Sequence, residues 1–362
     1  MHCQFLLVGS GWRAEFFLRA AMLLPSMFSV TGVVTQNPKM AQRYSEWGFI
    51  CRPSIDDALA ARAKPDFAVV SVQSKAQPGV VLDLLGRGLP VLEETPAAPS
   101  LDALVEMAVS IPHGAKLQVA EQYHLRPDHA ARINILRTGK LGRPVQALVS
   151  LTNNYHAISL IRRYLGISGI EADIRAQRFS VKGMPGHGRD GAPSEERPTA
   201  YPQTLATLDF GDALGIYNFE EAQHRSYIRS QHIQIKCERG EIDNNHIKYL
   251  LDYHTSMETP LLRRNKGEDE NMEGAGLKGI IADGAWVYEN PFHESRMTDD
   301  EIAVTECLAR MAAYCAGGPD LYSFAEAAQD AYFSQLIEEA VVSGHVVTAK
   351  RQPWTDALQT QR

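Results

Sequence analysis

The sequence is poor in cysteine and lacks the patterns that would use it for metal or disulfide chemistry. Its five cysteines are an odd number and include no Cys-x-x-Cys pair: Cys3, Cys51, Cys237, Cys307 and Cys315. Reduced thiols, mostly buried, are therefore expected. His-Glu-x-x-His, Gly-x-Ser-x-Gly and Walker patterns are absent as well. We expect neither a bound metal nor hydrolytic, acyl-transfer or phosphoryl-transfer chemistry.

Long apolar runs and basic clusters are also missing. No apolar run approaches the roughly 20 residues that a membrane helix needs, and the first residues are already strand-like rather than a leader. The formal net charge is −7 and the pI is near 6.0, which argues against nucleic acid as the main partner. We therefore expect a cytoplasmic protein with no membrane or nucleic-acid partner.

The most informative stretch that is present lies at residues 5–17. An apolar run ends there in Gly9-x-Gly11-x-x-Ala14, which is typical of a strand that turns into a helix around a dinucleotide pyrophosphate. Gly9 permits the tight turn, Gly11 allows the backbone to approach the phosphates, and Ala14 allows close packing of the helix on the strand. The motif alone is weak, because a glycine-rich turn in another α/β protein looks the same.

The following segments strengthen the dinucleotide interpretation. Short apolar or β-branched runs at 29–35, 66–72, 89–92 and 117–119 alternate with helix-like segments, which predicts a parallel sheet. The acidic residue that usually ends the second strand and binds the ribose is missing, since Thr35 and Gln36 stand there. Either could hydrogen-bond the ribose, so the choice between NAD and NADP stays open.

Beyond residue 122 the pattern changes to that of a second domain. Strands are predicted at 145–151, 205–210, 213–219, 232–237 and 241–243, and helices at 156–165, 300–316 and 325–342. Successive strands with tight turns favour an antiparallel sheet. In the last helix, residues 325, 328, 332, 336 and 340 are predicted to face the core. Residues 183–198 and 263–276 are predicted to be long loops.

Six segments in order carry a family resemblance: residues 9–14, 66–72, 88–97, 139–144, 156–160 and 322–330. Through them the sequence resembles the glucose-fructose oxidoreductase, inositol dehydrogenase and MocA (Gfo/Idh/MocA) family of nicotinamide-dependent enzymes. The resemblance implies an α/β fold with a Rossmann domain at 1–122, a substrate-binding and oligomerisation α/β domain at 123–350 with a largely antiparallel open sheet, and a C-terminal tail at 351–362. It also implies a substrate cleft between the domains, sugar-like or polyol substrates, and a homo-oligomer, dimer or tetramer.

The sequence departs from the family where proton transfer is concerned. The usual Glu-Lys-Pro is Glu94-Thr95-Pro96, so the lysine that commonly contacts the reacting hydroxyl is absent. The usual Asp-x-x-x-His keeps His156 but has Thr152 in place of the aspartate, and Ser159 replaces the acid three residues later. The loop at 73–77 also lacks the common Pro-Asn and His.

A histidine at the family position remains the best candidate for the proton carrier, because the imidazole group as a residue type can both donate and accept a proton near neutral pH. The predicted catalytic residues are His156, Tyr155, Tyr123 and His124. The predicted cofactor-binding residues are Gly9, Ser10, Gly11, Trp12, Arg13, Thr35, Gln36, Ser71, Gln73, Glu94, Thr95 and Pro96. The predicted substrate contacts are Arg126, Arg163 and His187. His187 and Arg189, in the loop predicted at 183–198, are candidates for residues of a lid. A structural role is the alternative for each histidine and arginine.

Three functions are compatible with these residues. The first is an NAD(P)-dependent oxidoreductase that transfers hydride between the nicotinamide and a sugar, polyol or related hydroxy compound. The second is a redox-neutral epimerase, lyase or glycosidase-type enzyme that oxidises a sugar carbon transiently and returns the hydride to the same NAD. The third is a sensor or regulator that binds the nucleotide and has lost the chemistry. The substrate depends on loops whose positions the sequence does not determine.

Overall fold

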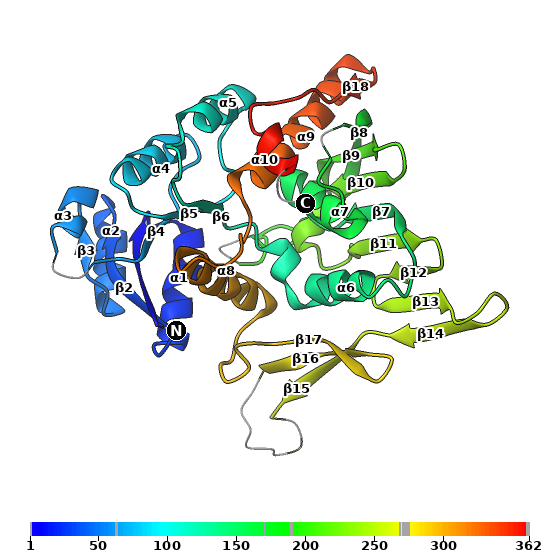
Figure 1. Ribbon diagram of the computed structural model, residues 1–362, viewed down its shortest axis with the longest axis horizontal. Coiled ribbons are helices and arrows are strands. Elements are labelled where there is room, and N and C mark those ends of the chain that lie inside the picture. Colours follow the sequence, from blue (N-terminus) through cyan, green and yellow to red (C-terminus); the bar gives the residue numbers. More distant parts are fainter. Residues whose placement is uncertain are drawn as a thin grey trace. The chain divides into compact units, whose positions relative to one another are not determined.

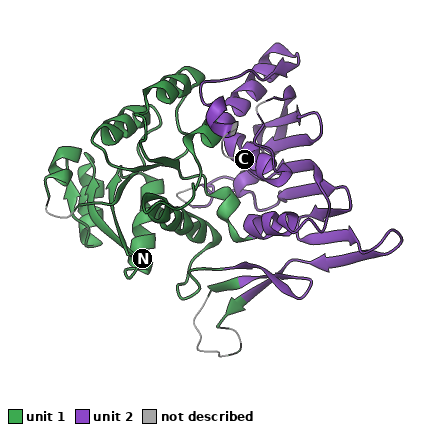
Figure 2. Cartoon of the chain, viewed as in Figure 1, with its two compact units in different colours: residues 1–127, 265–278, 290–328 green, residues 128–264, 279–289, 329–362 purple. Residues whose placement is uncertain are grey.

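The computed structural model describes residues 2–61, 64–169, 171–188, 191–267, 269 and 276–359. The chain divides into two compact units (Figure 2). Unit 1 comprises residues 1–127, 265–278 and 290–328, and unit 2 comprises residues 128–264, 279–289 and 329–362. Segment 290–328 thus packs with the N-terminal residues, although it follows the strands of the second sheet in the sequence.

Unit 1 is built on a six-stranded parallel sheet in the order β3-β2-β1-β4-β5-β6 (Figure 1). This order is that of a Rossmann fold, and the parallel sheet predicted from the sequence is confirmed. The strands are β1 (Cys3–Val8), β2 (Phe28–Val34), β3 (Cys51–Arg52), β4 (Phe67–Val70), β5 (Val91–Glu93) and β6 (Leu117–Val119). The helices between them are α1 (Trp12–Leu23), α2 (Pro38–Glu46), α3 (Ile55–Leu59), α4 (Gln77–Gly86) and α5 (Leu101–Ser110).

A later part of the chain completes unit 1. Helix α8 (Asp299–Cys315) packs against α1 and against the short 3₁₀ helix η1 (Tyr123–Leu125). A capping box between Thr298 and Glu301 begins α8, because each side chain satisfies a backbone N–H of the other. At the edge of the sheet, the side chain of Gln118 accepts from the backbone N–H of Tyr322 at 2.8 Å. These long-range contacts hold segment 290–328 in unit 1.

Unit 2 is built on a nine-stranded sheet in the order β14-β13-β12-β11-β7-β10-β9-β8-β18. All its neighbouring strands are antiparallel except β7 and β10, which are parallel, so the predicted largely antiparallel sheet is confirmed. The strands are β7 (Pro144–Ser150), β8 (Asp173–Gly183), β9 (Thr199–Asp209), β10 (Leu214–Glu220), β11 (His232–Cys237), β12 (Gly240–Asp243), β13 (His246–Leu250), β14 (Ser256–Pro260) and β18 (Val347–Thr348).

Helices cover one face of this sheet. Helix α7 (Asn154–Leu165) packs on β7 and β10. In the second half of β9 the alternate side chains of Thr204, Ala206 and Leu208 are buried. The remaining elements are α6 (Pro127–Arg137), η2 (Glu221–Arg225), α9 (Phe324–Ser343), α10 (Thr355–Gln359) and a three-stranded sheet of β15 (Leu262–Lys266), β16 (Gly276–Ala282) and β17 (Ala285–Glu289).

Most expectations for this part of the chain are confirmed, and one is wrong. The stripe on α9 is buried, since Ala325, Ala328, Tyr332, Leu336 and Ala340 are all at most 5% exposed. The loop predicted at 263–276 is wrong at its start, because β15 occupies Leu262–Lys266 and pairs with β16. The charged residues there suggested a loop, but an edge strand exposes its side chains to water and accepts charge.

All five cysteines are free. Two of them, Cys3 and Cys307, are buried, whereas the other three are half-buried, so the thiols are less buried than expected. None of the helices that the structure describes is long and apolar enough to cross a membrane.

Candidate functional site: the nucleotide turn and the residues around it

The glycine-rich turn joins β1 to α1 at the carboxyl edge of the Rossmann sheet. Gly9 has φ +119°, and a Cβ added there would lie 2.0 Å from the carbonyl oxygen of Ser71. Only glycine fits, because both the backbone conformation and the neighbouring strand exclude a side chain. A Cβ added at Gly11 would meet no described atom within 4 Å. The fold therefore requires glycine at position 9, whereas the space beside the backbone of Gly11 is not filled by described atoms.

The start of α1 has the properties of an anion site. Gly11 is the N-cap and offers no side chain to the first-turn N–H groups. These groups carry the positive end of the helix dipole and need an external acceptor. A pyrophosphate in the space beside Gly11 fits this requirement.

At the end of β2, Thr35 is held inside the fold rather than presented outward. Its hydroxyl donates to the Ser10 hydroxyl at 2.7 Å, and it is only 9% exposed. Thr35 therefore links the second strand to the glycine turn, while the neighbouring Gln36 is exposed. Of the two side chains, Gln36 is the one more accessible to a ribose.

An ion pair joins the glycine turn to the end of β5. Arg13 on α1 donates from Nε and Nη2 to Oε1 of Glu94, at 3.1 and 2.9 Å. The other carboxyl oxygen of Glu94 accepts from the backbone N–H of Thr95 at 3.3 Å. The guanidinium also lies over the ring of Phe16, 5.1 Å from its centre. Two predicted cofactor-binding residues thus orient each other, and a third, Thr95, stands beside them.

Gln77 at the start of α4 holds the segment after β5. Its side-chain amide donates to the carbonyl oxygens of Glu94 at 2.6 Å and Pro96 at 2.8 Å, and to Oε2 of Glu93 at 3.3 Å. Pro96 follows a cis peptide bond. Sequence reasoning missed the role of Gln77, because a single glutamine at the start of a helix carries no pattern that reveals partners 16 to 19 residues away.

Glu93 is a fully buried carboxyl group, and its Oε1 has no hydrogen-bond partner among the described residues. Burial raises the pKa of Glu93 well above its ordinary value, because an unpaired charge is costly in the interior, while the hydrogen bond from Gln77 lowers it by less. The folded protein therefore keeps this group protonated at a pH where the unfolded chain has released the proton.

This difference makes stability depend on pH. As pH rises from about 4.3, the usual glutamate value, to the raised pKa of Glu93, the wild type should lose stability by up to about 1.4 kcal/mol per pH unit. Glu93→Gln removes this titration. The free energy of unfolding of the variant, relative to that of the wild type, should therefore rise with pH. Urea unfolding from pH 5 to 8 measures this, with Glu106→Gln on the exposed side of α5 as the control. A difference in unfolding free energy between Glu93→Gln and the wild type that stays constant from pH 5 to 8 would contradict this prediction.

The predicted catalytic histidine lies in unit 2 at the start of α7. His156 occupies the first turn of this helix, which begins at Asn154 with φ 46°. It is half-buried, and its ring stacks at a tilt on that of Tyr155, with 4.4 Å between the ring centres. The structure therefore brings these two candidates together. Arg163 lies on the same helix and is half-buried.

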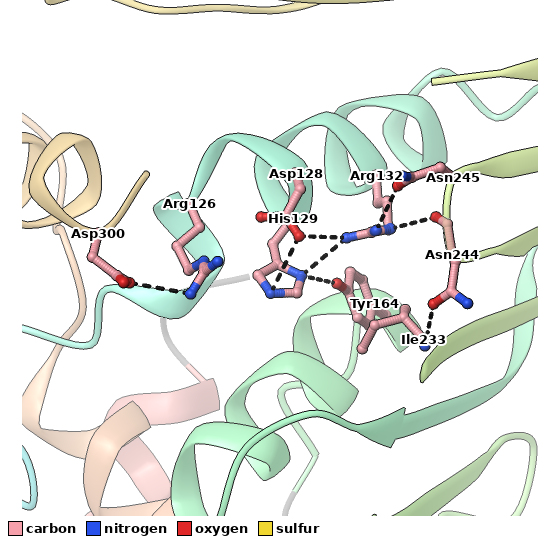
Figure 3. Close-up of polar contacts among 9 residues, drawn as sticks. All are labelled: Arg126, Asp128, His129, Arg132, Tyr164, Ile233, Asn244, Asn245 and Asp300. Carbon is pink, nitrogen blue, oxygen red and sulfur yellow. Dashed lines mark hydrogen bonds and ion pairs between the residues drawn. The ribbon is translucent and has the colours of Figure 1, made fainter. Parts of the chain in front are cut away.

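The other catalytic candidates, Tyr123 and His124, lie in η1 and are buried, at 7% and 8% exposed. The ring of His124 packs against that of Tyr322 at 5.3 Å. Arg126 donates to Asp300 at 3.1 Å, so this substrate candidate is engaged in an ion pair within unit 1 (Figure 3).

The remaining candidates lie elsewhere in the two units. His187 is exposed in the loop after β8 and packs on the ring of Tyr227. Arg189 lies outside the described residues. In unit 1, Ser71 is buried beside Gly9, whereas Gln73 and Trp12 are exposed.

A buried polar cluster in unit 2 was missed by the sequence analysis (Figure 3). The Nδ1 of His129 shares a hydrogen bond of 2.5 Å with the hydroxyl of Tyr164. Arg132, 4% exposed, donates to Asp128 at 3.1 Å and to the backbone oxygen of Asn244 at 2.9 Å. The four-residue spacing of Asp128 and Arg132 was the one available signal. The cluster ties α6 and α7 to the turn between β12 and β13.

A comparison with protein families identifies the kind of domain that the N-terminal residues of unit 1 form. Residues 3–120 match the Gfo/Idh/MocA family model, described as "Oxidoreductase family, NAD-binding Rossmann fold". The resemblance inferred from the sequence motifs is confirmed over these residues, which form an NAD-binding Rossmann domain of this oxidoreductase family. A comparison with curated proteins gives no significant match.

Solved structures of similar fold match nearly the whole chain. An oxidoreductase from Agrobacterium radiobacter in complex with NAD+, L-tartaric acid and magnesium has a TM-score of 0.68 at 14% identity, covering 96% of this chain and 98% of that one. Levoglucosan dehydrogenase in complex with NADH also has a TM-score of 0.68 at 14% identity, with 97% and 100% covered. The WlbA dehydrogenase from Bordetella pertussis in complex with NADH and UDP-GlcNAcA has 0.64 at 15%, with 97% and 100% covered. At these identities the similarity defines the fold.

Proposed function

We propose that the protein is an NAD-dependent oxidoreductase that transfers hydride between the nicotinamide and a carbon bearing a hydroxyl group in a sugar, polyol or related hydroxy compound. The observation that carries the proposal is the uncapped start of α1 beside Gly11, within a domain that matches an NAD-binding oxidoreductase family. The substrate class is supported by structures of similar fold that hold levoglucosan or UDP-GlcNAcA with NADH.

The residues of this chain divide the work as follows. The first-turn N–H groups of α1 bind the pyrophosphate, and Ser10 and Thr35 hold the turn in place. The pair of Arg13 and Glu94 stabilises the end of β5 next to Thr95. When bound, the nicotinamide accepts or supplies the hydride. His156 removes the hydroxyl proton during oxidation and returns it during reduction, with Tyr155 beside it.

Three finer properties belong to the same proposal. Thr35 and Gln36 stand where an acidic residue would repel the 2′-phosphate of NADP. We therefore infer that the enzyme uses NADP as well as NAD. The face of the nine-stranded sheet that lacks helices exposes Phe179 and Leu205, which supports an association of identical chains through this face. The protein works in the cytoplasm.

A cofactor and substrate panel tests the function directly. One portion of the purified protein is denatured to identify any nucleotide that it releases, and a second, native portion is mixed with NAD and with aldoses, polyols or sugar acids while NADH absorbance is followed. Net consumption of the cofactor supports the oxidoreductase. Product formed from a sugar without net change in NADH would establish the redox-neutral alternative, and nucleotide binding with no conversion of any compound would favour the sensor.

A further inference from the structure

Unit 2 contains a cavity of about 690 Å³. None of the residues predicted to be catalytic or cofactor-binding lines it. It lies along β8, β9 and β10 and is bordered by η2, the loop after β8 and Glu338 of α9. A cavity of this size suits a small molecule. Asn153 and Asn154 at the start of α7 also line it, which places the cavity next to the helix that carries His156.

The two arginines of the cavity differ in their partners. Arg178 donates from Nη2 to Glu338 at 2.5 Å and from Nε to the hydroxyl of Thr204 at 3.0 Å, so its charge is balanced. The side chain of Arg225 makes no hydrogen bond or ion pair with any residue that the structure describes, although Arg225 is half-buried. A guanidinium keeps its charge at any physiological pH. The cavity wall thus contains a cation that no described carboxylate contacts directly.

A second polar group in the wall has a hydrogen to donate. The hydroxyl oxygen of Tyr217 accepts from the backbone N–H of Asn154 at 3.3 Å, and its own hydrogen is given to no described residue. Burial raises the pKa of Tyr217 to about 12, so the hydroxyl stays protonated. The ring of Phe219 stacks near that of Tyr217, with centres 6.3 Å apart. The wall therefore combines an aromatic surface with donors.

We propose that this cavity binds a polyhydroxy compound that carries an oxyanion, with Arg225 binding the anionic group and Tyr217 donating to an oxygen of the hydroxylated chain. A guanidinium suits a carboxylate or a phosphate, because its fork of N–H groups matches two oxygens. Glu221 and Glu338 line the same space, and a carboxylate oxygen can accept from a hydroxyl group. In so far as this compound is the substrate, the inference rests on the proposed oxidoreductase function and narrows its substrate class.

Calorimetric titration with three probes tests the site: gluconate, glucose 6-phosphate and the neutral sorbitol. We expect an oxyanion to bind more tightly than sorbitol, and Arg225→Gln to weaken that oxyanion's binding about 10- to 100-fold, the usual effect of losing a charge-assisted hydrogen bond. Arg175→Gln is the matched control, because Arg175 is an exposed arginine of β8 outside the cavity wall. Tyr217→Phe should reduce affinity about 5-fold while keeping the ring.

Some outcomes of this titration identify the anionic group that the site binds, and others overturn the proposal. Dependence on Arg225 for gluconate alone assigns a carboxylate, and for glucose 6-phosphate alone a phosphate. Equal binding of sorbitol and both anions, unchanged affinity in Arg225→Gln, or no binding of any probe overturns the proposal. Circular dichroism of each variant verifies folding, and if Arg225→Gln does not fold, Arg225→Lys replaces it, with a smaller loss expected because the charge remains.

The same probes keep this inference distinct from the proposed function. Binding of an oxyanion that depends on Arg225, with no NADH formed from any compound, would retain the site and reject the oxidoreductase. NADH formed only from neutral sugars, with no binding of the anions, would retain the oxidoreductase and reject the site.

Discussion

Replacing His156 by glutamine is expected to lower turnover about 10²- to 10⁴-fold, the usual range for loss of a general acid or base. Glutamine keeps the size and hydrogen-bonding capacity of the side chain but cannot take up a proton near pH 7. The affinity for NAD should stay unchanged, because the nucleotide site lies on β1 and α1. Steady-state rates on the substrate found in the panel, together with NAD titration, measure both effects.

The variant His246→Gln is the matched control for this measurement. His246 is an exposed histidine on β13, so its loss should leave turnover within about two-fold of the wild type, since surface changes away from a site have small effects. Tyr123, His124 and Tyr155 should be changed in parallel. Near-normal rates in His156→Gln, with loss of activity on changing Tyr123 or His124, would show that the proton route runs through η1.

The second large effect concerns the glycine turn. Gly11→Val should weaken NAD binding at least about 100-fold, or about 2.7 kcal/mol, because its branched side chain would fill the space that the pyrophosphate needs. The backbone at Gly11 has φ −77° and ψ 177°, which valine adopts without strain. The open space around it also means that the variant should fold with near wild-type stability.

Gly9→Ala is the contrasting variant for the same turn. Its methyl group would overlap the carbonyl of Ser71 and would force an L-residue to a φ of +119°, so we expect a loss of about 3 kcal/mol or more in folding stability. Thermal unfolding without nucleotide and NAD titration separate the two effects. If Gly11→Val binds NAD normally, or if Gly9→Ala is as stable as the wild type, the assignment of this turn fails.

Much of the fold was predictable because local patterns determine it. The turn at Gly9 and Gly11, the apolar runs that became β2 and β4, and the period of α9 are all properties of neighbouring residues. These features were sufficient to predict a Rossmann sheet and a second, largely antiparallel sheet. The family resemblance was carried by short motif segments, and those at 9–14, 66–72 and 88–97 lie within the residues 3–120 that match the family model.

The surroundings of the site depended on residues far apart in the sequence. The pairing of Arg13 with Glu94 spans 81 residues, and the contact of Gln118 with Tyr322 spans 204. No local propensity encodes such contacts, since they form only when strands and helices pack. The same reason explains why segment 290–328 joins unit 1 and why Gln77 was overlooked.

By itself, the sequence determined the class of fold, the nucleotide turn and the set of candidate side chains, because these follow from backbone constraints and from residue chemistry. Only the tertiary structure decided which candidates are engaged and which lie open. It placed Thr35 against Ser10, buried the Glu93 carboxyl group, and left Arg225 in a cavity wall without a described partner. The physical reason is that burial and pairing, which control charge and hydrogen bonding, arise from packing between distant segments.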